Sequence, residues 1–90
     1  MEKEWVLYML RCRDGSLYTG ITNNLEKRLE AHRSGKGAKY TRGRGPLELV
    51  YTEKCEDKSA ALKREVEIKK LSIDEKIQLI GANKNPEDQI

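Results

Sequence analysis

The sequence predicts an α+β fold in which helices flank a small three-stranded antiparallel sheet, in the order β-β-α-β-α-α. Two strand-forming stretches joined by a turn open the chain, an alternating stretch follows residue 46, and three segments are rich in helix formers. Ninety residues, of which 37% are hydrophobic, can bury one modest core. We therefore expect a single domain over residues 1–80 and a polar tail over residues 81–90.

The first two strands are predicted to form a β-hairpin. Residues 5–12 are a short, almost unbroken apolar run, and residues 17–21 alternate after a turn at residues 13–16. A two-residue turn would place Tyr8 and Tyr18 on opposite faces of the hairpin. A three-residue loop with Gly15 in the left-handed conformation would place both tyrosines on one face. The sequence leaves the two alternatives open.

A first helix is expected over residues 24–33, with Asn23 as its N-cap. At about 100° per residue, Arg28 and His32 fall on the same inward stripe as the helix's two leucines. Either side chain alone could simply cover the edge of a core. A guanidinium and an imidazole one turn apart on that stripe together indicate a polar site.

The rest of the chain is predicted to contain a third strand and two more helices. Residues 47–53 alternate after a proline, which predicts that Leu47, Leu49 and Tyr51 share the more buried face of a strand. Residues 58–71 have helical composition and length. Residues 72–80 are predicted to form a last helix because Ser72 and Glu75 make a capping box.

Glu65 falls in the middle of the apolar arc of the helix predicted over residues 58–71, whereas Glu67 points the opposite way. A carboxylate in that position is costly to desolvate unless a cation, a metal or hydrogen-bond donors meet it. Two interpretations follow: Glu65 is a metal ligand, or it forms a structural ion pair with Arg28.

Positive charge is concentrated between His32 and Pro46, where five basic residues and no acidic ones occur. They leave 13 basic residues against 15 acidic ones in the rest of the chain. Such a segment favours a polyanion, because neutralising phosphates releases counterions. The alternative is a solvated, solubilising loop. The five residues are Arg33, Lys36, Lys39, Arg42 and Arg44.

Several protein classes are not predicted. The sequence has no apolar run long enough to cross a membrane, no signal-peptide core and no P-loop, dinucleotide or zinc-binding motif. Cys12 and Cys55 are interpreted as reduced strand residues. We expect a cytoplasmic protein that does not interact with membranes.

Two short motifs, Val6-Leu7-Tyr8 and Tyr18-Thr19-Gly20, resemble the two halves of the GIY-YIG nuclease signature, with their tyrosines ten residues apart. The resemblance covers residues 4–71 and is closest to the short stand-alone bacterial members. Val6 and Leu7 replace the glycine and isoleucine of the first motif. Four further positions match functional residues of the family: Arg28, His32, Tyr40 and Glu65.

The resemblance implies a metal-dependent endonuclease that hydrolyses phosphodiester bonds in nucleic acid, in repair or recombination, with DNA favoured over RNA. Glu65 would hold one divalent metal ion, Mg²⁺ in preference to Mn²⁺. Tyr8 would activate the attacking water as a phenolate, with its pKa lowered by the charge of Arg28. The remaining catalytic candidates would position water, phosphate or protons: Tyr18, His32 and Tyr40.

Four basic residues would hold flanking phosphates without reading bases, and a protein partner could supply specificity. These residues are Lys36, Lys39, Arg42 and Arg44. One alternative function is a non-catalytic module on the same fold that binds nucleic acid or recruits a partner. Another is an interaction domain whose basic segment meets an acidic protein.

Overall fold

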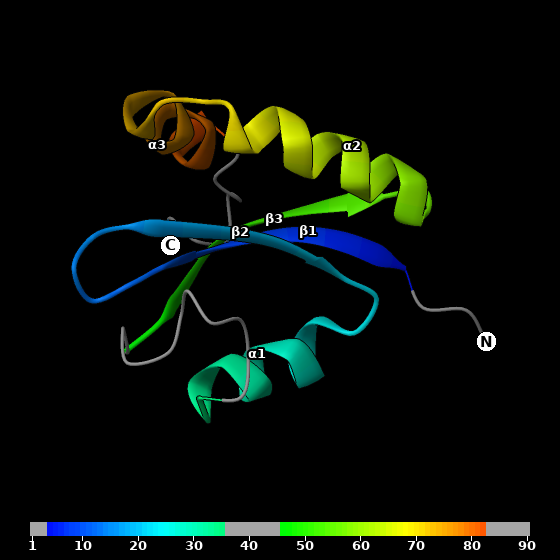
Figure 1. Cartoon of the computed structure of the whole chain (residues 1–90), viewed down its shortest axis with the longest axis horizontal. Coiled ribbons are helices and arrows are strands. Elements are labelled where there is room, and N and C mark those ends of the chain that lie inside the picture. The colour runs from blue at the N-terminus through cyan, green and yellow to red at the C-terminus, as the bar shows by residue number, and fades with distance from the viewer. Residues whose placement is uncertain (1–3, 36–45, 83–90) are drawn as a thin grey trace.

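The computed structural model of the protein describes residues 4–35 and 46–82. Its three strands and three helices follow the predicted order, so the α+β class is confirmed (Figure 1). The elements are β1 (Trp5–Arg11), β2 (Leu17–Thr22), α1 (Leu25–Arg33), β3 (Glu48–Cys55), α2 (Lys58–Lys69) and α3 (Ile73–Ala82).

The sheet has the strand order β2-β1-β3 and is antiparallel throughout. The helix α1 covers one face, and α2 and α3 cover the other (Figure 1). Because β1 is the central strand and has helices on both sides, its residues are apolar on both faces. This arrangement explains the unbroken apolar run in the sequence.

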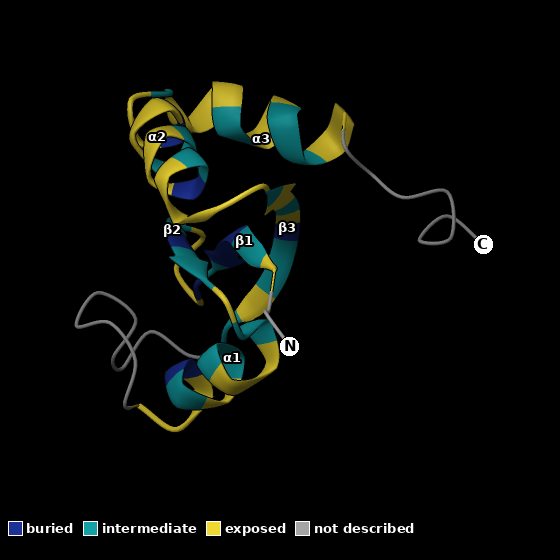
Figure 2. Cartoon of the chain, turned by 90° about the vertical axis from the view of Figure 1, so that its right-hand side faces the viewer, coloured by how far each residue is buried: buried dark blue, intermediate teal, exposed yellow. Residues whose placement is uncertain are grey.

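The apolar core lies between the sheet and the α2–α3 layer. It is built from Leu7 and Met9 of β1, Tyr51 of β3 and Ile68 of α2. Figure 2 shows buried residues on the strands and on the side of α2 that faces them. The α1 face holds a different, more polar set of side chains.

The hairpin loop decides which residues reach the α1 face. Gly15 has φ +87° and donates its N–H to the carbonyl of Cys12 at 2.9 Å, while the N–H of Cys12 donates to the carbonyl of Ser16 at 2.8 Å. This is the three-residue loop with a left-handed glycine. Leu10 therefore pairs with Tyr18, and both tyrosines lie on one face.

The start of α1 differs from the prediction by one residue. Asn24, not Asn23, is the N-cap, because its side-chain oxygen accepts a hydrogen bond from the N–H of Lys27 at 3.3 Å. The side chain that caps a helix must reach the second or third N–H of that helix, and Lys27 is the third residue after Asn24.

The third strand contains an irregularity that the alternating pattern does not reveal. Met9 pairs with Tyr51 and Leu10 pairs with Leu49, so Val50 is an extra residue in β3. Val50 and Tyr51 both join the α2–α3 side, and Leu49 lies opposite Leu10. The prediction that Leu49 and Tyr51 share a face was therefore wrong.

The last helix begins as predicted but is longer. The N–H of Ser72 donates to the carboxylate of Glu75 at 2.9 Å, and the N–H of Glu75 donates to the hydroxyl of Ser72 at 3.2 Å. This confirms the capping box. The helix continues to Ala82, two residues into the predicted tail, and residues 83–90 lie outside the described part of the chain.

Candidate active site

Tyr8 is the centre of a polar cluster between the sheet and α1. Its side chain is fully buried, and its hydroxyl lies 2.8 Å from Nε2 of His32. Nε of Arg28 donates to the same hydroxyl at 3.5 Å. Arg28 and His32, on the predicted inward stripe of α1, thus both contact the phenol oxygen of Tyr8.

Glycine is required at position 20 because the ring of Tyr8, on the paired strand, lies against it. Gly20 pairs directly with Tyr8, and a Cβ there would lie 2.7 Å from the tyrosine hydroxyl and 2.8 Å from its Cζ. Only glycine lets the phenol lie this close to β2. The sequence pointed to Gly20 only as the last letter of a motif, because a close approach across strands is invisible before the strands are paired.

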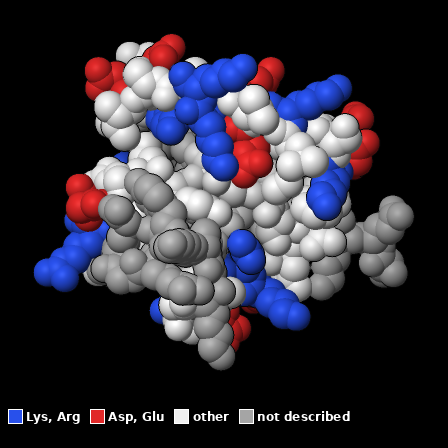
Figure 3. Space-filling view, viewed as in Figure 1, with Lys and Arg blue, Asp and Glu red and all other residues white. Residues whose placement is uncertain are grey.

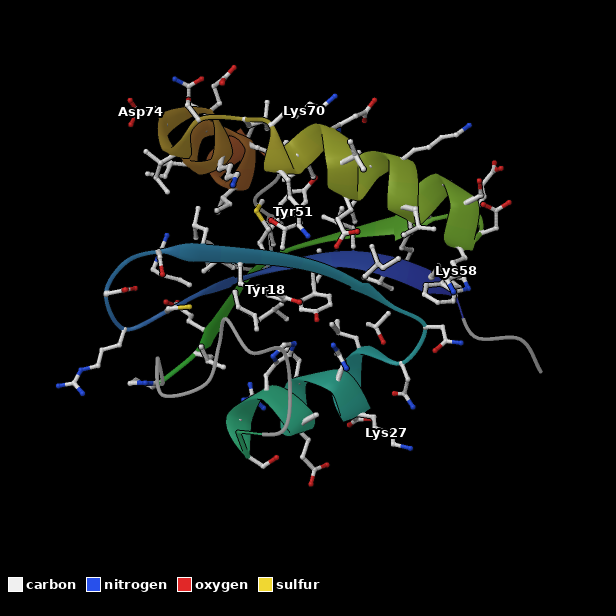
Figure 4. The ribbon with its side chains drawn as sticks, in the orientation of Figure 1. Tyr18, Lys27, Tyr51, Lys58, Lys70 and Asp74 are labelled. Atoms are coloured by element: carbon white, nitrogen blue, oxygen red, sulfur yellow. The ribbon has the colours of Figure 1, made fainter. Side chains whose placement is uncertain are left out.

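Tyr18 completes an aromatic group on this face. Its ring centroid lies 5.3 Å from that of His32 and 6.3 Å from that of Tyr8. Figure 4 shows Tyr18 on the side of the sheet that faces α1. Tyr18 is only partly buried, so the group opens to the surface at this residue.

The cluster favours neutral side chains. Burial raises the pKa of Tyr8 to about 12, although the hydrogen bond from Arg28 acts in the opposite direction. Burial also lowers the pKa of His32 below 6.5, and the charge of Arg28 adds to this effect. The expectation that Arg28 lowers the pKa of Tyr8 enough to give a phenolate is therefore not met. At neutral pH, Tyr8 is a phenol and His32 a neutral imidazole.

The polar cluster also holds α1 on the sheet. His32 is 2% exposed and is the buried residue of this helix, whereas Leu25 and Leu29 are only partly buried. Helix position and site geometry therefore depend on the same side chains.

Glu65 lies on α2, the helix that covers the opposite face of the sheet. Its side chain is 19% exposed, compared with 65% for Glu67, so the predicted difference between the two glutamates is confirmed. Its carboxylate forms an ion pair with Lys69 at 3.2 Å, whereas Arg28 bonds to Tyr8. Among the described residues, the structural ion pair between Glu65 and Arg28 is not found.

Comparisons with known proteins show the family of this chain. The sequence matches the GIY-YIG catalytic domain over residues 4–78. The chain belongs to the GIY-YIG family. A UPF0213 protein of Oceanobacillus iheyensis is 58% identical over 80 residues, which span 89% of this chain and 93% of that protein. A UPF0213 protein of Clostridium perfringens is 57% identical over 82 residues, which span 91% and 88%.

Two solution NMR structures resemble the fold. A UPF0213 protein of Bacillus halodurans has a TM-score of 0.60 at 47% identity, over 92% of this chain and 88% of that one. A protein of E. faecalis has a TM-score of 0.63 at 43% identity, over 91% and 90%. These relatives place the chain in the UPF0213 group of the GIY-YIG family.

GIY-YIG nucleases typically use divalent metal ions, and among the described residues Glu65 offers one partly buried carboxylate, paired with Lys69, to such an ion. Nowhere in residues 4–35 and 46–82 do three His, Cys, Asp or Glu side chains gather into a ligand set. The partly buried carboxylate of Glu65 is a hard oxygen donor of the kind that Mg²⁺ takes singly, keeping its other positions for water and substrate. A single carboxylate fits an ion that binds together with a phosphate.

The remaining candidates of this GIY-YIG chain lie outside the described residues: Lys36, Lys39, Tyr40, Arg42 and Arg44. The described part carries 12 basic and 12 acidic residues, so its charges balance. Figure 3 accordingly shows basic and acidic side chains mixed on one face. None of the described helices is long and apolar enough to cross a membrane.

Proposed function

We propose that this GIY-YIG protein is a metal-dependent endonuclease that hydrolyses phosphodiester bonds in nucleic acid, DNA in preference to RNA, in repair or recombination. The observation that supports the proposal is that His32 and Arg28 both hydrogen-bond to the hydroxyl of Tyr8. A buried acid–base pair beside a guanidinium has the chemistry that phosphodiester hydrolysis needs.

Tyr8 and His32 act together as the base. The phenol, with a pKa of about 12, does not ionise at neutral pH, whereas the neutral imidazole can accept a proton. Water that enters with the substrate at the partly exposed Tyr18 attacks phosphorus and transfers its proton to the Tyr8 oxygen as the Tyr8 proton moves to Nε2 of His32. The P–O bond breaks, its electron pair leaves with the departing oxygen, and that oxygen takes a proton from solvent while the His32 imidazolium releases one. The phenol is neutral before and after the step. No phenolate has to exist in the buried site.

Arg28 binds the phosphate. Its guanidinium donates to the Tyr8 hydroxyl through Nε and also interacts with Tyr18. A guanidinium carries five N–H donors, so others can bind a non-bridging oxygen. Charge builds on that oxygen in the transition state, so a fixed cation stabilises the transition state more than the ground state. Tyr18, at the partly exposed end of the group, orients water and phosphate.

We propose that the substrate binds across the edge strand β2, which α2 also contacts. Glu65 on the α2 side would then hold the divalent cation, Mg²⁺ or Mn²⁺, and this ion would supply Lewis acidity and charge neutralisation at the phosphate. Beyond the described residues, Tyr40 contributes to positioning. The basic residues hold flanking phosphates without reading bases. These are Lys36, Lys39, Arg42 and Arg44. A protein partner or a distorted substrate supplies specificity.

The proposal is tested on labelled single-stranded, duplex, flapped and branched DNA and on RNA, with Mg²⁺ or Mn²⁺. Wild type and Glu65→Ala are purified in parallel, because contaminating nuclease is the main hazard. We expect cleavage of at least one substrate by wild type and loss of that cleavage in the variant. Equal cleavage by both proteins would indicate contamination. Binding without cleavage across the whole panel would contradict the proposal and favour a non-catalytic nucleic-acid-binding module.

A further inference from the structure

A second polar network lies on the opposite side of the sheet from Tyr8, between β3 and α2. The Tyr51 hydroxyl donates to the carboxylate of Glu53, two residues along the same strand. Nε of Arg64, on α2, donates to both oxygens of that carboxylate, at 2.9 and 3.2 Å. Figure 4 shows Tyr51 between the sheet and the helices. One carboxylate thus joins a strand to a helix through a charged, two-oxygen contact.

This contact fixes α2 in a way that its apolar packing does not. The helix buries Ala61 and Ile68 against the sheet, and Ala61 offers only a methyl group. Apolar contacts are non-directional and tolerate rotation of a helix about its axis. The contact from Arg64 to Glu53 is directional, because a guanidinium and a carboxylate meet in one plane.

Arg64 directly precedes Glu65 in α2, so the two side chains are about 100° apart on one rigid helix. Any rotation or sliding of α2 that lengthens the contact between Arg64 and Glu53 also moves the Glu65 carboxylate. Arg64 is anchored further by Glu67 at 3.2 Å, but that residue belongs to the same helix and cannot fix it to the sheet.

We infer that the Tyr51–Glu53–Arg64 network is a positioning device that sets the rotation of α2 and thereby the place where the Glu65 carboxylate meets a metal ion. The inference rests on the metal-binding role proposed for Glu65. The three residues touch neither metal nor substrate. They act through Glu65, as outer residues do when they orient a ligand.

The test measures Mn²⁺ affinity by the broadening of backbone amide NMR signals near residue 65, without substrate. Arg64→Met keeps the side-chain length and removes the contact to Glu53. Lys63→Met removes the same charge from the preceding, exposed residue of α2 and is the matched control. Electrostatics alone predicts that either loss of a positive charge strengthens cation binding. A positioning role predicts instead that Arg64→Met weakens Mn²⁺ binding and that Lys63→Met does not.

We expect Arg64→Met to weaken Mn²⁺ binding roughly tenfold, which is the lower end of the range typical when an outer-shell partner of a metal ligand is lost. Lys63→Met should bind equally well or more tightly, and Arg64→Lys should recover part of the loss. Glu53→Gln changes the other partner of the same contact and should also weaken Mn²⁺ binding. In cleavage, Arg64→Met should raise the Mg²⁺ concentration needed for half-maximal rate more than it lowers the rate at saturation.

Two results would overturn the inference in different ways. If Glu65→Gln abolishes the Mn²⁺ broadening but Arg64→Met binds as tightly as wild type or more tightly, the network does not position Glu65, and the metal role stands. If wild type shows no broadening around residue 65, or Glu65→Gln leaves it unchanged, the proposed metal role fails and the inference fails with it.

Discussion

The hydroxyl of Tyr8 lies 2.8 Å from Nε2 of His32, and this contact joins the central strand to α1. Tyr8 is fully buried and His32 is 2% exposed, so the pair is shielded from bulk water. In such surroundings a hydrogen bond is strong and an unmatched partner is costly. The same pair therefore holds the helix in place and keeps a phenol and an imidazole in register for proton transfer.

The first prediction concerns the protonation of His32. Its pKa is lowered by burial and then by the charge of Arg28, so the unfolded chain binds this proton more tightly than the folded protein does. Its contribution to stability is fully present above the ordinary pKa of 6.5 and is lost as the pH falls towards the lowered value. His32 is the only histidine in the chain, so its NMR signal is unambiguous. The NMR titration midpoint should lie below 6.5.

The control is His32→Gln, compared with wild type by urea unfolding over a range of pH. Wild type should lose extra unfolding free energy as the pH falls below 6.5, and the variant should not. A titration midpoint above 6.5, or parallel stability curves, would show that the imidazole is not held neutral.

A second prediction follows from the close approach of Tyr8 to Gly20. In Gly20→Ala the new methyl group would lie 2.7 Å from the Tyr8 hydroxyl, so the ring must move. We expect a loss of about 1–3 kcal/mol in unfolding free energy, as for other overpacked sites, together with loss of cleavage. Gly81→Ala is the control, because a Cβ there meets no atom within 4 Å. Normal cleavage by a folded Gly20→Ala protein would refute the role of Tyr8 geometry.

The two glutamates of α2 provide a third prediction. Glu65→Gln should suppress Mg²⁺-dependent cleavage by orders of magnitude, because it removes the partly buried carboxylate. Glu67→Gln should change little, because that side chain is 65% exposed and its ion pair, within the described part of the chain, is with Arg64 of the same helix. The measurement is the single-turnover cleavage rate at several Mg²⁺ concentrations. Similar losses in both variants would contradict the distinction between the two helix faces.

The fourth prediction concerns the basic segment. Replacing four basic residues together with Gln should weaken nucleic-acid binding about equally for all sequences, because phosphate contacts carry no sequence information. The slope of log affinity against log salt should become shallower by up to about 3.6 for duplex DNA. Fluorescence anisotropy over a salt series measures it, and an unchanged slope would exclude phosphate contact. The residues are Lys36, Lys39, Arg42 and Arg44.

Most of the fold follows from local patterns. Helical spacing correctly brought Arg28 and His32 to one inward face and separated Glu65 from Glu67. The boundaries were less accurate, because neighbouring asparagines compete for one cap and only Asn24 is spaced to reach the N–H of Lys27. Periodicity reports on one helix or strand at a time.

Relationships between elements could not be predicted from such patterns. The extra residue Val50 in β3 changes which side chains share a face, and it becomes visible only once the strands are paired. The need for glycine at position 20 depends on the ring of Tyr8 across the sheet. The pKa of Tyr8 depends on the balance between burial and the Arg28 hydrogen bond, which the sequence does not provide.

The most direct test of proton transfer through Tyr8 is the Mg²⁺-dependent cleavage rate of Tyr8→Phe, measured in single turnover on the best substrate of the panel. The substitution removes one buried hydroxyl and leaves the ring in place, so circular dichroism should show a folded protein. We expect a rate at least about 100-fold below that of wild type, because a proton-transfer group is lost. A folded Tyr8→Phe protein that cleaves at the wild-type rate would contradict the claim that this phenol takes part in the reaction.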